Sequence, residues 1–145
     1  MKITMIAALS IASAATTLHL AAIAHADTDF NFHSPSGNIF CDMHTGDDGN
    51  AQTTCIVTDQ TWVSPPRSPD CAADQRWGDA LSLYQGSASF QCYRQTPNYQ
   101  GQILNYGQTL ANGPITCDSE PAGMTCTDNN TGHFFRIARE SYQLG

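Results

Sequence analysis

The residues of this sequence with the most readily assigned chemistry are its six cysteines, Cys41, Cys55, Cys71, Cys92, Cys117 and Cys126. Because their number is even and no Cys-x-x-Cys pair or finger-spaced histidine accompanies them, we expect disulfides rather than a metal site or a catalytic thiol. Six cysteines allow roughly fifteen pairings. Local patterning favours the scheme with the bonds Cys41–Cys55, Cys71–Cys92 and Cys117–Cys126. Each bond should add roughly 2.7–3.4 kcal/mol to the free energy of unfolding, because it lowers the entropy of the unfolded chain.

Three histidines, His33, His44 and His133, could act as bases or metal ligands. They lack the spacing of a His-Glu-x-x-His site, so we expect no metal and no cofactor. A serine hydrolase is also disfavoured, because no Gly-x-Ser-x-Gly elbow occurs. Two functions are considered for this chain: non-enzymatic binding, and catalysis by a small secreted hydrolase or metal-dependent enzyme. The enzyme is the alternative hypothesis, and its site would assemble only in three dimensions. A cleft that holds His44 or His133 beside a carboxylate or a serine would favour that alternative.

The residues we select as a binding site are Trp62, Arg67 and His133. Trp62 lies close to Pro65 and Pro66, and we expect its ring to be exposed, where it could stack on a sugar or anchor a protein partner. The function we expect is therefore non-enzymatic binding of a protein or a glycan at the cell envelope, by a monomer.

The charge of the chain excludes one class of partner. Lys2 is its only lysine, and residues 27–145 carry five arginines against thirteen acidic residues, a formal charge of −8. Proteins that bind nucleic acids neutralise phosphates with clustered lysine and arginine. We therefore expect no nucleic-acid partner.

The N-terminus has the three parts of a secretory signal. Lys2 supplies a positive start, an Ala/Ile/Leu-rich stretch follows, and Ala24-His25-Ala26 provides small residues for a peptidase. We predict a cleavable signal peptide over residues 1–26 and a single secreted domain over residues 27–145. No second apolar run follows, so the mature chain should have no integral membrane segment and should lie outside the cell or in the cell envelope.

Short strands separated by Gly, Pro and Asn turns predict an all-β fold for the mature chain, a small disulfide-stabilised sandwich or partly open barrel with little helix. Two strand pairs, at 39–43 with 53–58 and at 113–118 with 124–128, form hairpins with a cysteine in each arm. We predict further strands at 80–84, at 88–93, at 103–110 with an interruption at Gly107, and at 133–139, followed by a tail over residues 140–145. Any helix would be a single turn near residues 70–76 or in this tail.

The phrase Ser34-Pro35-Ser36-Gly37-Asn38-Ile39-x-Cys41 resembles the opening of a family of small actinobacterial secreted proteins and lipoproteins. Later elements match in the same order: Trp77-Gly78, Tyr106-Gly107-Gln108, Gly123-Met124-Thr125-Cys126, Thr131-Gly132-His133-x-Phe135 and Arg139-Glu140-Ser141-Tyr142. The resemblance covers nearly all of the mature chain. The family has no assigned function, so the resemblance implies a secreted protein but no catalytic residues.

Overall fold

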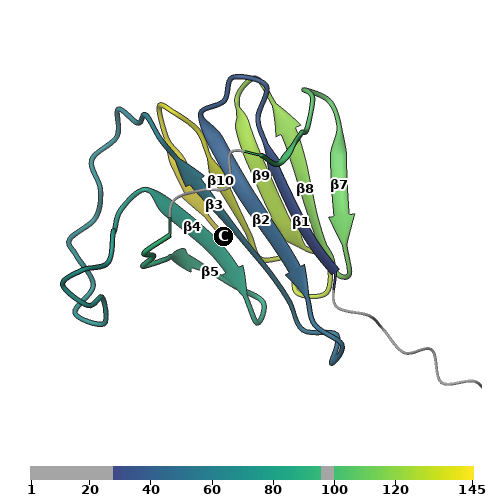
Figure 1. The fold of residues 1–145 in the computed structure, drawn as a ribbon, viewed down its shortest axis with the longest axis horizontal. Coiled ribbons are helices and arrows are strands. Elements are labelled where there is room, and N and C mark those ends of the chain that lie inside the picture. Colours follow the sequence, from purple (N-terminus) through teal and green to yellow (C-terminus); the bar gives the residue numbers. More distant parts are fainter. Residues whose placement is uncertain (1–27, 96–99) are drawn as a thin grey trace, which may run out of the picture.

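The computed structural model describes residues 28–95 and 100–145, and the predicted signal peptide lies outside them. The described chain folds into eleven strands in two sheets that pack face to face as a β-sandwich (Figure 1). This confirms the all-β prediction and selects the sandwich over the barrel. Within these two stretches the chain has no helix, and so none that is long and apolar enough to cross a membrane.

The first sheet has six strands in the order β5-β4-β3-β2-β1-β6. Strands β1 to β5 follow one another as an antiparallel meander, and the chain then returns to pair β6 in parallel with β1 at the far edge. The bounds of these strands are β1 Thr28–His33, β2 Ile39–Thr45, β3 Ala51–Val57, β4 Ala80–Tyr84, β5 Ser87–Phe90 and β6 Gln102–Ile103.

The second sheet is a purely antiparallel meander in the order β11-β10-β9-β8-β7. Its strands pack over the first sheet, with β7 against β2, β8 against β3 and β10 against β4. The bounds are β7 Thr109–Asn112, β8 Ile115–Glu120, β9 Gly123–Asp128, β10 Phe134–Ile137 and β11 Tyr142–Leu144.

Two of the strand predictions need correction. The segment 103–110 is not one interrupted strand, because β6 belongs to the first sheet and β7 to the second. Gly107, at φ +84°, lies in the turn that carries the chain between the two sheets. The tail over residues 140–145 contains a strand rather than a helical turn, since the backbones of Phe134 and Gly145 exchange two hydrogen bonds, of 2.8 and 2.9 Å, and β11 pairs with β10.

All six cysteines are paired, in the combination that local patterning favours. Cys41 lies directly opposite Cys55 across β2 and β3, and Cys117 lies opposite Cys126 across β8 and β9. The Cα atoms of these pairs are 4.1 and 4.0 Å apart, in the range of directly opposed residues in antiparallel strands. The two bridges meet at the centre of the sandwich, where the sulfurs of Cys55 and Cys126 are 3.9 Å apart.

The core around these sulfurs is apolar and drawn from both sheets. Every second residue of the central strands points inward, as the period of a strand requires. The largest fully buried side chains are Phe32, Phe135, Met43, Leu81, Leu83, Ile115, Met124 and Ile137.

We expect the double variant Cys117→Ala, Cys126→Ala to lose about 2–5 kcal/mol of unfolding free energy. The variant Cys71→Ala, Cys92→Ala should lose less, although its bridge closes 21 residues rather than 9. The reason is that Cys117 and Cys126 are fully buried, so that removing their sulfurs also leaves a cavity. Urea unfolding measures both variants. A larger loss of unfolding free energy for Cys71→Ala, Cys92→Ala than for Cys117→Ala, Cys126→Ala would contradict the central role given to this bridge. So would a wild-type melting temperature that reductant leaves unchanged.

Candidate functional site

Trp62, which we predicted to be exposed, is half-buried at the edge of the sandwich. Its indole N–H donates to the carbonyl oxygen of Ala138 at 3.0 Å, and its ring lies 4.8 Å from that of Tyr142. Phe90 packs against both rings, with centroids 6.1 and 4.9 Å away. The prediction of a projecting ring is therefore wrong. The sequence did not show it because the packing partners come from β5 and β11, which are distant in the chain.

Arg67 and His133 have contacts of their own. The guanidinium of Arg67 donates to the carbonyls of Ala72 and Gln75, at 2.5 and 2.8 Å, within the long loop between β3 and β4. His133 lies just before β10, whereas Trp62 bonds to Ala138 just after it, so these two residues lie at opposite ends of that strand. The contribution of all three residues to binding stays a prediction.

His44 does stand beside a carboxylate. Its Nδ1 is 2.6 Å from Oδ1 of Asp29 on the neighbouring strand, an arrangement that could orient a general base. Both side chains are exposed, at 38% and 70%. Among the described residues, the wall of the hollow that His44 lines consists of Gly46, Asp47, Asp48, Asn50, Ala51, Gln52 and Tyr84, and these include no serine, threonine or cysteine. Across residues 28–95 and 100–145, no group of three His, Cys, Asp or Glu residues is placed to hold a metal ion.

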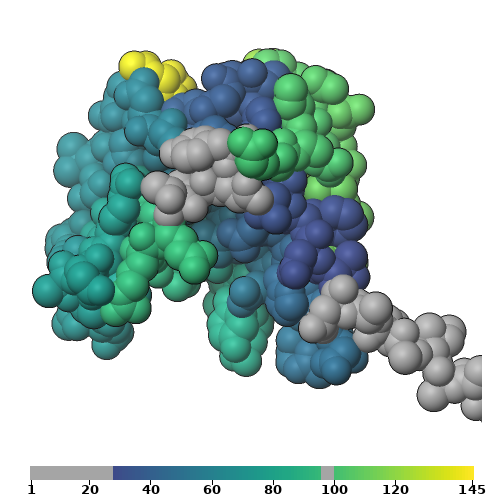
Figure 2. Space-filling view, viewed as in Figure 1, coloured from purple at the N-terminus to yellow at the C-terminus, as the bar shows by residue number. Residues whose placement is uncertain are grey.

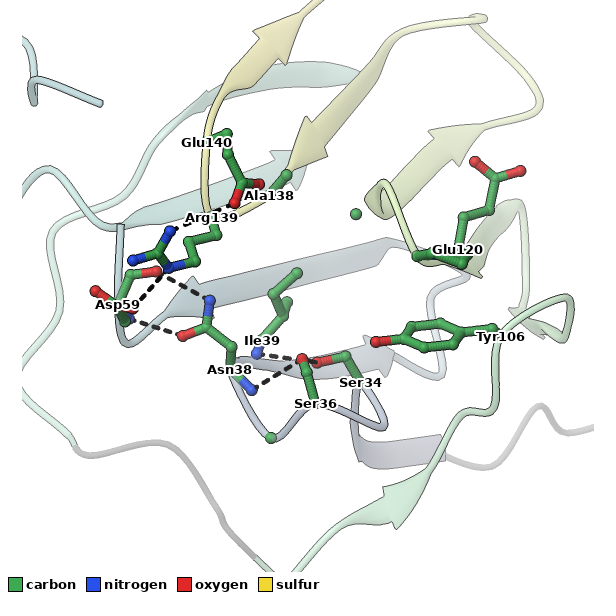
Figure 3. A pocket seen from close by; sticks show the side chains of 13 residues that line it. Ser34, Ser36, Asn38, Ile39, Asp59, Tyr106, Glu120, Ala138, Arg139 and Glu140 are labelled. Carbon is green, nitrogen blue, oxygen red and sulfur yellow. Dashed lines mark hydrogen bonds and ion pairs between the residues drawn. The ribbon is translucent and has the colours of Figure 1, made fainter. Parts of the chain in front are cut away.

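A cleft of about 420 Å³ lies at the end of the sandwich where the turns β1–β2, β8–β9 and β10–β11 meet (Figure 3). We call it the rim cleft. Its polar and charged lining residues are Ser34, Ser36, Asn38, Asp59, Tyr106, Glu120, Arg139 and Glu140. We did not predict these residues as a site, yet many belong to the segments that carried the family resemblance. Nothing in their order along the chain indicates that they converge.

The floor of the rim cleft is a turn held by side-chain hydrogen bonds. Ser34, which is 4% exposed, accepts the backbone N–H of Ile39 on its Oγ at 3.1 Å and contacts the Oγ of Ser36 at 2.9 Å. The Asn38 amide donates to the carbonyl of Asp59 at 2.9 Å and accepts the backbone N–H of the same residue at 2.8 Å. Both serine hydroxyls are thus engaged in the hydrogen bonds of the β1–β2 turn.

One side of the cleft is an ion-pair network. The Nε of Arg139 lies 2.8 Å from Oδ2 of Asp59, and its Nη1 lies 3.5 Å from a carboxylate oxygen of Glu140. The hydrogen bond from Arg139 to Asp59 and the charge of that carboxylate raise the pKa of the guanidinium, so Arg139 stays charged at any physiological pH. The positive charge is thus already satisfied by two carboxylates.

Tyr106 and Glu120 form the opposite side of the cleft (Figure 3). The Tyr106 side chain is 44% exposed, and its hydroxyl points towards Ser34 and Ser36. Glu120 forms no ion pair with any residue that the structure describes. With one arginine against three carboxylates, the cleft carries a formal charge of −2.

Gly123 lets the β8–β9 turn approach β10. Its φ is +136°, and a Cβ at this position would lie 2.6 Å from the carbonyl oxygen of Ile137 and 3.0 Å from the Cβ of Ala138. Only glycine has both the required conformation and the required lack of bulk. The turn that carries Glu120 is therefore held against the turn that carries Arg139.

The fold and the cleft together define a small cystine-linked β-sandwich with a polar cleft at one end. The chain belongs to a family of unknown function, DUF6636, whose family model matches residues 8–144. The comparison with curated proteins found no match, and neither did the comparison with solved structures. The resemblance is thereby confirmed at the level of a family without an assigned function.

We expect Gly123→Ala to lower the free energy of unfolding by about 1–3 kcal/mol more than Gly107→Ala does. Both glycines have positive φ, so alanine is strained at either position by about 1–2 kcal/mol. A Cβ at Gly107, however, meets nothing within 4 Å, whereas at Gly123 it meets backbone. Thermal unfolding of the two variants measures the difference. Equal costs would show that the β8–β9 turn does not need its close contact with β10.

Proposed function

We propose that this protein is a non-enzymatic binding domain that acts outside the cytoplasm, and that the rim cleft binds a basic side chain of a cell-envelope protein. The observation that carries the proposal is the separation of charges across the cleft. Asp59 and Glu140 hold Arg139 on one side, while Glu120 and the ring of Tyr106 stand opposite, open to a ligand.

The chemistry of the open side suits an arginine or lysine. The Glu120 carboxylate attracts the positive charge, and the Tyr106 ring in the same cleft adds a cation–π interaction of about 0.5–1 kcal/mol where the ligand lies over its face. The Asp59–Arg139–Glu140 network leaves a residual negative charge beside this position. A negatively charged ligand would meet repulsion from the same groups.

Binding is better supported than hydrolysis. The serines of the rim cleft are engaged in the β1–β2 turn, and the His44–Asp29 pair has no nucleophile in its hollow. An enzyme built on His44 is the alternative, and the observation that favours it is the one we specified from the sequence: His44 lines a hollow and its Nδ1 lies 2.6 Å from the carboxylate of Asp29.

Three disulfides support the location outside the cytoplasm, because such bonds persist mainly in oxidising compartments. The signal peptide over residues 1–26, the actinobacterial origin and the monomeric state stay predictions. Trp62 is no longer the residue on which the binding site depends.

The experiment is capture of envelope proteins on the immobilised, oxidised protein, with the partner identified by mass spectrometry. We expect Glu120→Gln and Tyr106→Leu each to reduce affinity for that partner by about two- to fivefold, the range of an exposed charge pair or a cation–π contact. Raising the salt concentration from about 50 to about 500 mM should weaken binding by the wild type more than binding by Glu120→Gln. The reason is that salt screens the attraction between Glu120 and the ligand, which the variant lacks.

Asp70→Asn is the matched control, since Asp70 is an exposed carboxylate in the β3–β4 loop, outside the lining of the rim cleft. It should bind like the wild type. If Asp70→Asn and Glu120→Gln weaken capture equally, the effect is one of net charge and the cleft is not the site. Capture that disappears when the partner is deglycosylated would transfer the function to glycan binding.

A further inference from the structure

A row of polar side chains crosses the outer face of the six-stranded sheet. Asn31, Asp42, Thr54 and Ser82 are consecutive partners in the register of β1, β2, β3 and β4, so they share one face and one line. We call them the polar row. They line a cleft of about 560 Å³, together with Gln52, Ile56, Tyr84 and residues 91–95. Figure 2 shows this face, with the β2–β3 and β4–β5 turns projecting separately at its lower edge.

The neutral members of this row have hydrogen-bonding capacity to spare. Within residues 28–95 and 100–145, the side chains of Asn31, Thr54 and Ser82 form no hydrogen bond. Ser82 is only 4% exposed as a residue, but its hydroxyl is open to the cleft rather than sealed in the core. Its Oγ can therefore donate and accept hydrogen bonds with a molecule in the cleft.

The charges around the cleft favour an uncharged ligand. Arg94 lines the cleft, but its guanidinium binds the carboxylate of Asp74 at 2.8 and 3.2 Å. Among the described residues that line the cleft, Asp42 carries the one carboxyl group. Neutral amides and hydroxyls, which both donate and accept, make up the rest of the row. They match the hydroxyl groups of a sugar better than they match a phosphate or a basic side chain.

The spacing of the row suits a polymer. Neighbouring strands lie about 4.8 Å apart, so a chain laid across the sheet meets one polar side chain at each step of about that length. This step is comparable with the length of one sugar residue. Tyr84, on the next row of the same face, is 52% exposed and offers a ring on which the apolar face of a sugar can stack.

We propose that the cleft over the polar row binds an uncharged glycan laid across strands β1 to β4, with its hydroxyl groups hydrogen-bonded to Asn31, Thr54 and Ser82. This site is separate from the rim cleft and does not depend on the function proposed there.

The test is a titration of the oxidised protein, labelled for NMR, with four neutral tetrasaccharides: β-1,4-linked glucose, β-1,4-linked N-acetylglucosamine, α-1,4-linked glucose and α-1,6-linked mannose. We expect one of them to shift the backbone amides of Asn31, Thr54 and Ser82. The double variant Thr54→Val, Ser82→Ala should bind it about tenfold more weakly, because two hydrogen bonds of roughly 0.5–1.5 kcal/mol are lost.

Thr125→Val is the matched control. Thr125 is a partly exposed threonine on the outer face of the other sheet, so this variant makes the same chemical change away from the polar row. It should bind like the wild type. The proposal is overturned if none of the four sugars shifts these amides, if the double variant binds normally, or if the shifts fall only at Tyr106 and Glu120.

The pH dependence gives a second readout of the same site. Desolvation by the surrounding protein raises the pKa of Asp42 to about 6, and the charge of Asp29 adds to the rise, whereas a backbone hydrogen bond and the charge of His44 oppose it. A carboxylate accepts hydrogen bonds more strongly than the neutral acid does. Wild-type affinity for the sugar should therefore increase as pH rises from 5 to 7.

Asp42→Asn should remove this pH dependence. The other charged groups around Asp42 are unchanged in this variant: Asp29 with its partner His44, and Arg94 with its partner Asp74. A variant that keeps the full dependence would show that Asp42 is not the titrating group and would overturn its contact with the sugar.

Discussion

The structure depends on the contact between two disulfides at the centre of the sandwich. Cys41–Cys55 crosses one central hairpin and Cys117–Cys126 crosses the other, and the sulfurs of Cys55 and Cys126 meet at 3.9 Å. Each bridge joins residues that face one another, so neither hairpin can slip by one position without breaking it. The same bonds therefore fix which side chains of β2, β3, β8 and β9 point inward and which are left for the surface.

The fixed register has consequences on both sides of each sheet. Inward positions take Phe32, Met43, Leu81 and their neighbours, which build the core against the sulfurs. Outward positions of the six-stranded sheet take the polar row, so a one-residue error would bury Asp42. At the edge where β5 and β11 come together, Trp62 from the long loop closes the sandwich by packing on Tyr142 and Phe90.

The two clefts differ in the chemistry they offer. The rim cleft is built by turns and carries an excess of carboxylates around one neutralised arginine. The cleft over the polar row is built by strands and consists mainly of neutral donors and acceptors. A strand-built site is positioned by the hydrogen bonds of the sheet, whereas the rim cleft depends on close contacts between turns, such as that of Gly123 with Ile137.

The sequence by itself determined the class of fold and its covalent framework. Cysteines two residues after an isoleucine, in strands flanked by Gly and Asn turns, were enough to predict both hairpins, since strand period and turn chemistry are local properties. The tertiary structure alone decided the sites. Trp62 became a packing residue because β5 and β11 approach it, and Gly107 became a crossover between sheets. Tyr106 and Glu120 meet at the rim, and Asn31 aligns with Ser82 across three strand pairings. Such juxtapositions depend on which strands become neighbours, and this long-range pairing leaves no local pattern in the chain.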